Sequence, residues 1–211
     1  MYKRQELRGA GNLLGADQSG HASEVGLEMY TDLLGEAIAE LRGQTPENPK
    51  VDTEIKLAVT ALIPQSYIKD EGLRLQFYKS LFTVERSAEL TGIADEMKDR
   101  FGTPPEETGR LFLVARLKLI LSWLGASQIA VNPKAGWFEI RFGSLKEKQI
   151  DRIIGEVQRK PNIYRLSPDY KLYLYWEDQT KSRTLDAVPQ TEMLKHLLEL
   201  LEPLAAGLEN G

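Results

Sequence analysis

The residues best suited to chemistry lie at the start of the chain, where Arg8 and Gln18 stand in the segment RGAGNLLGADQSG. Glycines allow a backbone to approach a phosphate or another backbone closely. The guanidinium of Arg8 carries several donors, and the amide of Gln18 both donates and accepts. The pattern therefore predicts a loop that contacts a charged or polar group. A surface ion pair at Arg8 and a local cap by Gln18 are the alternative that the residues leave open.

Signatures of catalysis and of nucleotide binding are missing from the sequence. It contains no G-x-x-x-x-G-K-[ST] phosphate loop and no G-x-S-x-G nucleophile elbow. The spacing of Gly9, Gly11 and Gly15 does not fit a dinucleotide loop, and no strand is expected before it. Only two histidines and no cysteine are present. We therefore expect a chain without a catalytic site, metal or cofactor of its own.

Composition favours a cytoplasmic globular protein. The chain has 211 residues, 42% of them hydrophobic, and a formal net charge of −4. This acidic balance excludes a general basic field for nucleic acid, so any such contact must be local. No apolar run is long enough for a membrane span, and we expect no contact with a membrane. The absence of cysteine fits a reducing compartment.

The elements that must position these residues follow from hydrophobic periodicity. Apolar residues at helical spacing between 25 and 41 predict helical structure, and the polar stretch 44–52, with two prolines, predicts a linker. We therefore divide the chain into a helical-hairpin segment, 1–50, and a second domain, 51–211. In that domain the pattern predicts strands at 54–63, 129–131, 137–142, 163–166 and 170–176, and helices near 73–82, 90–101, 103–124, 144–158 and 191–204. Because strands and helices do not alternate regularly, the fold class is α+β.

Two capping patterns set the expected starts of helices in this domain. Thr103-Pro-Pro-Glu106 combines a capping hydroxyl, prolines and a glutamate, and Ser144-Leu-Lys-Glu147 forms a second capping box. Gly102 and Gly125 are expected to end the two preceding helices.

Together these motifs resemble the bacterial transcription-repair coupling factors. The segment from Arg8 to Gly20, followed by Val25-Gly-Leu-x-x-Tyr30-x-x-Leu-Leu34, is similar to the translocation motif that this family shares with RecG-type branch-migration translocases. Arg74-Leu-x-Phe-Tyr-Lys79, Asp99-Arg-Phe-Gly102 and Tyr164-Arg-Leu166 follow in the order expected of the family's C-terminal domain. The resemblance covers essentially the whole chain. It implies a C-terminal fragment of such a protein, a translocation motif followed by a regulatory α+β domain.

The resemblance also implies roles for particular residues. Arg8 and Gln18 fall on the pair that couples ATP hydrolysis, with its Mg²⁺, to movement of the parent protein on duplex DNA. The second domain would dock on the UvrB-like N-terminal module of the same protein and cover the surface that recruits UvrA until the motor engages stalled RNA polymerase. Glu96 and Asp99 fall on the acidic contact positions of this interface. They are three residues apart and therefore share a helical face, although a merely solvated face is the alternative.

The sequence leaves two other classes of function open. A stand-alone nucleic-acid-binding module could use aromatic residues as a stacking platform, namely Tyr164, Tyr170, Tyr173, Tyr175 and Trp176. We expect these side chains instead to pack under neighbouring helices, with Tyr173 and Tyr175 on the strand face opposite Leu172, Leu174 and Trp176. Nearby basic residues are dispersed, at Lys160, Arg165, Lys171, Lys181 and Arg183. An enzyme with an unrecognised site is the class that the sequence favours least.

Overall fold

A five-stranded mixed sheet forms the centre of the described part of the chain. The computed structural model describes residues 53–177 and 184–209, so Arg8, Gln18 and the expected helical-hairpin segment lie outside the described residues. The strand order is β1-β2-β3-β5-β4. β1 (Glu54–Lys56) pairs parallel with β2 (Ala126–Asn132), whereas β3 (Trp137–Phe142), β5 (Leu172–Tyr175) and β4 (Tyr164–Leu166) continue the sheet with antiparallel pairs. The expected hairpin between β2 and β3 is confirmed.

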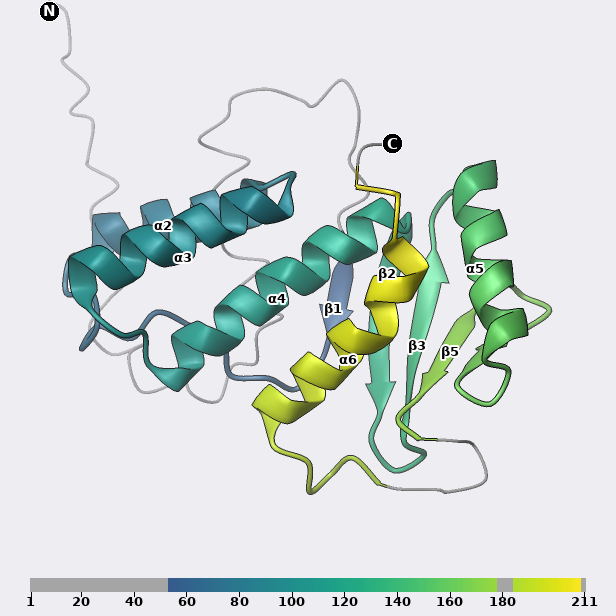
Figure 1. The fold of residues 1–211 in the computed structure, drawn as a ribbon. Helices are drawn as coiled ribbons and strands as arrows, with labels where there is room; N and C mark the ends of the chain where they lie inside the picture. The colour runs from purple at the N-terminus through teal and green to yellow at the C-terminus, as the bar shows by residue number, and fades with distance from the viewer. Residues whose placement is uncertain (1–52, 178–183, 210–211) are drawn as a thin grey trace, which may run out of the picture.

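Helices cover one face of this sheet. α4 (Glu106–Trp123), α5 (Glu147–Arg159) and α6 (Gln190–Ala205) lie on that face (Figure 1). Fully buried side chains from both layers meet between them, among them Leu121, Ile129, Phe138, Leu174 and Leu201. Burial of this apolar surface is the main stabilising contribution to the fold. The α+β class predicted from the sequence is confirmed.

A pair of helices extends this layer away from the sheet. α2 (Glu71–Thr83) and α3 (Ser87–Phe101) lie on the far side of α4 (Figure 1). Their inner faces bury Phe77, Leu81, Leu90 and Met97. Gly102 ends α3 as expected, with a φ of 83° that glycine adopts without strain.

The expected strand 54–63 is much shorter than predicted. Only Glu54–Lys56 pair with a neighbouring strand, and residues 57–63, which we call the strap, run on between the helices. Alternate strap residues remain buried from Leu57 to Ile63, so the period-two pattern is real. Helix side chains and termini, not a strand, bind the polar groups of Thr60, Leu62 and Ile63 in the strap. The Oγ1 of Thr108 donates to the carbonyl of Leu62 at 3.0 Å, and the Ile63 N–H donates to the Tyr78 hydroxyl oxygen at 2.7 Å.

Both helices exist, but the prediction that Thr103 and Ser144 cap them is wrong. Pro105, not Thr103, occupies the N-cap of α4, and no side chain caps it. At α5 the N-cap is Lys146, two residues beyond Ser144. The side chain of Gln149 accepts a hydrogen bond from the Lys146 N–H at 2.7 Å and donates to the carbonyl of Trp123 at 2.6 Å. The capping interaction therefore also ties α5 to the end of α4.

None of the described helices is long and apolar enough to cross a membrane.

Candidate docking surface

The two acidic residues singled out in the sequence lie together on the outside of α3. Glu96 and Asp99 are both exposed, and Asp95 is exposed beside them. We call these three residues the acidic surface. Met97, on the opposite side of the helix, is completely buried against the neighbouring helices. Lys98 is also exposed on α3, so the carboxylates are not the only charges there. The geometry permits one partner to contact all three carboxylates at once.

One member of the acidic surface has a partner within its own helix. An Nη1 of Arg100 lies 2.5 Å from an Oε1 of Glu96, one helical turn away. In contrast, Asp95 and Asp99 make no ion pair with any of the described residues. An exposed i,i+4 pair such as Arg100–Glu96 contributes little to stability, about 0.3–0.5 kcal/mol. Its effect on the charge that the acidic surface presents to a partner is more important here.

Aromatic rings hold Arg100 in this position. Its guanidinium carbon lies 5.6 Å from the ring centroid of Phe77 and 5.1 Å from that of Phe101. Both distances are within the range of cation–π attraction. Sequence reasoning missed Arg100 and Phe77 as parts of this surface. The i,i+4 spacing of Glu96 and Arg100 was the available signal, whereas the approach of Phe77 from another helix had none.

The end of α3 is fixed by a tyrosine from the segment before α2. The hydroxyl of Tyr67 donates to the carbonyl of Gly102 at 2.8 Å and lies 3.2 Å from that of Met97. Its ring meets Phe101 edge to face, with the ring centroids 6.0 Å apart. Carbonyl groups at a helix end lack partners within the helix. Tyr67 therefore satisfies this terminus and keeps the acidic surface on an ordered turn.

The expected packing of the aromatic residues holds for only some of them. Tyr164 and Trp176 are buried, and the hydroxyl of Tyr164 donates to the carbonyl of Leu200 in α6 at 2.8 Å. Tyr173 and Tyr175 lie opposite Leu172 and Leu174, as predicted, but on the sheet face away from the helices. Tyr170 is 72% exposed. The alternation along β5 showed which residues share a face, but not that the helices cover only one face.

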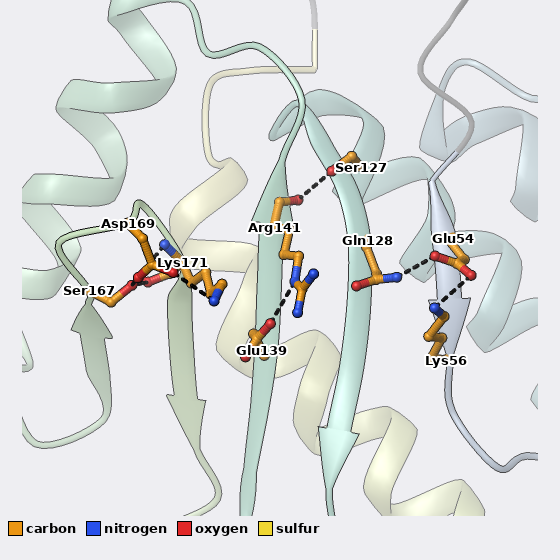
Figure 2. A network of polar contacts seen from close by, with 9 residues as sticks. All are labelled: Glu54, Lys56, Ser127, Gln128, Glu139, Arg141, Ser167, Asp169 and Lys171. Carbon is orange, nitrogen blue, oxygen red and sulfur yellow. Dashed lines mark hydrogen bonds and ion pairs between the residues drawn. The ribbon is translucent and has the colours of Figure 1, made fainter.

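The face of the sheet opposite the helices carries paired charges (Figure 2). Arg141 contacts Glu139 at 2.7 Å, and Lys171 contacts Asp169 at 2.6 Å. Hydrogen bonds from Lys171 and then Ser167 lower the pKa of Asp169 to about 2. Because Arg141 and Lys171 each have a carboxylate beside them, these two cations do not form the continuous basic strip that a phosphate backbone requires.

A second row of polar contacts continues this face to the sheet edge. Glu54 lies 2.9 Å from Lys56 and accepts a hydrogen bond from Gln128 on the neighbouring strand (Figure 2). These interactions, that with Lys56 first, lower the pKa of Glu54. Trp137 and Tyr173 meet edge to face with their ring centroids 5.0 Å apart. The rings therefore contact each other as well as solvent.

No constellation for metal chemistry is present in the part of the chain that the structure describes, since no group of three or more His, Cys, Asp or Glu side chains is placed to hold a metal ion there.

A shallow groove of about 470 Å³ lies beside the first half of α6 and is lined by Trp176, Lys195 and His196. The ring centroids of Trp176 and His196 are 4.2 Å apart, and the Nε2 of His196 lies 2.9 Å from the carbonyl oxygen of Trp176. His196 therefore packs against Trp176.

The central part of the chain matches a known domain family, and the fold resembles a solved structure. Residues 57–153 match the model of the TRCF domain. A solved structure, the C-terminal domain of a transcription-repair coupling factor, superposes on this chain with a TM-score of 0.60. The superposition covers 75% of this chain and 94% of the solved one. Its sequence is 16% identical, so this likeness concerns the fold alone.

Curated relatives extend the similarity over most of the chain. The transcription-repair-coupling factor of Myxococcus xanthus is 37% identical over 167 residues, which are 79% of this chain and 14% of that protein. The one from Haemophilus influenzae is 32% identical over 205 residues, 95% of this chain and 17% of that protein. The chain is homologous to the C-terminal region of transcription-repair coupling factors. The matched part of the chain spans 14% and 17% of the length of these two relatives.

Proposed function

We propose that this chain is the C-terminal regulatory region of a transcription-repair coupling factor, an ATP-dependent DNA translocase that removes stalled RNA polymerase. In this proposal the acidic surface of α3 docks on the UvrB-like N-terminal module of the same protein. Docking covers the surface that recruits UvrA until the motor is engaged. The observation that carries the proposal is the placement of Glu96 and Asp99, exposed together on one turn of a helix whose other side is firmly packed.

Electrostatics fits such a regulatory contact. Charged groups at the edge of an interface give specificity and speed of association more than affinity, so the contact can be released when conditions change. The carboxylates lie on a rigid helix fixed by Tyr67 and by the buried Met97. Little conformational entropy is therefore lost in ordering the helix backbone on docking.

The remaining roles concern residues and partners outside the described part. We propose that residues 1–50 form the translocation motif, with Arg8 and Gln18 as the coupling pair. ATP and Mg²⁺ would be bound by motor lobes elsewhere in the parent protein, and this region itself would be regulatory, not catalytic. The site of action would be the cytoplasm, with duplex DNA bound by the parent.

A binding experiment tests the docking. The 211-residue chain is titrated with the separately produced UvrB-like module of a coupling factor, and affinity is measured by calorimetry at low salt. We expect the double variant Glu96→Gln/Asp99→Asn to bind at least about tenfold more weakly, since it removes two charges without changing shape. Asp151→Asn/Glu199→Gln, which removes two exposed carboxylates from α5 and α6, serves as the matched control and should bind normally.

The same components test whether docking covers the UvrA site. The module is mixed with UvrA in the presence and absence of the chain, and the amount of complex is measured. Wild-type chain should reduce UvrA binding, and the double variant should reduce it much less. Equal affinity of the wild type and the double variant for the module would contradict the proposed role of the acidic surface.

The competing function is a nucleic-acid-binding module that acts alone. The paired charges of the open sheet face do not favour it. Tight binding of duplex DNA by the isolated chain, with a steep loss of affinity as salt rises, would favour this alternative instead.

A further inference from the structure

Arg100 already occupies part of the surface proposed to receive a partner. Its guanidinium contacts the Glu96 carboxylate at 2.5 Å and lies over the rings of Phe77 and Phe101. A basic partner that recognises Glu96 must bring a group of the same chemistry to the same carboxylate, whose Oε1 already contacts Arg100. It must therefore displace Arg100 or approach it closely, and both events oppose binding.

The position of Arg100 is not that of a freely moving surface cation. Phe77 is buried and comes from α2, and its ring packs edge to face on Phe101 with the centroids 5.9 Å apart. The two rings form a fixed support for the aliphatic and guanidinium parts of Arg100. The arginine thus remains beside Glu96 when no partner is bound, and half of its side chain stays accessible, at 45% exposure.

We propose that Arg100 is a built-in competitor that sets the affinity of the acidic surface for its basic partner. This inference rests on the proposed docking function and adds a residue that limits it. Asp95 and Asp99, which have no ion pair among the described residues, provide the freely available charges. The Oε1 of Glu96 becomes available only as Arg100 yields. The affinity of the acidic surface is thereby kept low enough for the partner to be released.

The expected effect is modest and measurable. Removing an exposed i,i+4 ion pair frees Glu96, and this by itself raises the affinity for the partner about twofold. Removing a positive charge about 5 Å from the incoming cation in a largely aqueous environment contributes a further few-fold. Together the two effects predict that Arg100→Gln binds the partner about three- to tenfold more tightly at low salt. The gain should diminish as salt screens the charges.

The test uses the 211-residue chain and the UvrB-like module as the probe, with dissociation constants measured at two salt concentrations. Arg100→Gln is compared with Arg116→Gln, which removes an arginine of similar exposure from the Arg116–Glu202 pair, whose Nη2 and Oε1 atoms are 2.6 Å apart. This pair lies near Ser87, at the opposite end of α3 from Arg100. Arg100→Lys retains the charge and should bind close to the wild type. Thermal melting of every variant checks that α3 remains folded.

The outcomes separate this inference from the function on which it rests. Tighter binding by Arg100→Gln, without a similar gain in Arg116→Gln, supports the competitor role. If Glu96→Gln/Asp99→Asn weakens binding while Arg100→Gln is unchanged or weaker, the docking function stands and the competitor role is wrong. A gain of equal size in Arg116→Gln would show a general charge effect and would also overturn the competitor role. If the wild-type chain and all variants fail to bind, both proposals fail.

Discussion

Replacement of Gly125 by alanine should destabilise the protein strongly, because three structural requirements meet at this residue. Its φ is +70°, where a side chain costs about 1–2 kcal/mol. A Cβ atom there would lie 2.6 Å from the carbonyl oxygen of Ser144 and 3.3 Å from the Gln149 amide. The Gln149 amide would have to give way by a few tenths of an ångström, which weakens its two hydrogen bonds, worth about 1 kcal/mol each. We expect a total loss of about 3 kcal/mol in the free energy of unfolding, since some relaxation offsets the sum.

Urea denaturation followed by circular dichroism measures this loss. Gly155→Ala is the matched control, because Gly155 lies inside α5 and a Cβ there meets no atom within 4 Å. Alanine has the higher helix propensity, so the control should gain about 0.5–1 kcal/mol. A loss below about 1 kcal/mol for Gly125→Ala would refute the reasoning that the α4–β2 turn and the start of α5 are rigidly joined through this glycine.

Two further predictions concern titration. Burial raises the pKa of Tyr164 to about 12, so the stability due to its protonated hydroxyl is complete below the ordinary tyrosine pKa of 10 and is lost as pH rises toward 12. Tyr164→Phe should flatten the fall in urea midpoint between these pH values, and an unchanged slope would contradict it. Asp169, with a pKa of about 2 caused mainly by Lys171, loses its native-state contribution as pH falls from about 4 through 2. In Lys171→Gln, carbon NMR should show the Asp169 titration moving up toward 3.8, whereas a midpoint still near 2 would exclude Lys171 as the main cause.

Local signals predicted the elements well, and tertiary partners decided what they missed. The apolar spacing in α3, ended by Gly102, defines a helix without outside help, and it exists at Ser87–Phe101. The strap has the alternation of a strand because one side of it is buried. Its neighbours are helices, however, and no single-sequence pattern distinguishes burial against a helix from pairing with a strand.

Capping and the candidate site show the same limit. Ser144 offers a suitable hydroxyl, but Gln149 can join two elements at once, and the start of α5 follows that longer-range interaction. On α3, helical spacing predicted that Glu96 and Asp99 share a face, and both are exposed. The contact of Arg100 with Phe77 depends on how α2 packs against α3, which sequence spacing does not encode. The roles of Arg8 and Gln18 and the division near residue 50 stay predictions.

The strap also has a mechanical consequence. Tension applied to the chain before Thr53 reaches α2 through a series of attachments, first the bond from the Thr53 hydroxyl to the Ala126 carbonyl and the short β1–β2 pairing. The bonds of Thr60 with Gln190 and Arg110 follow, and then those of Leu62 with Glu107 and Thr108 and that between Ile63 and Tyr78. Because these attachments are arranged one after another along the chain, they yield in order and not all at once. The protein thus has a graded tether at this end, on which a pull is absorbed stepwise before the helices that carry the acidic surface are disturbed.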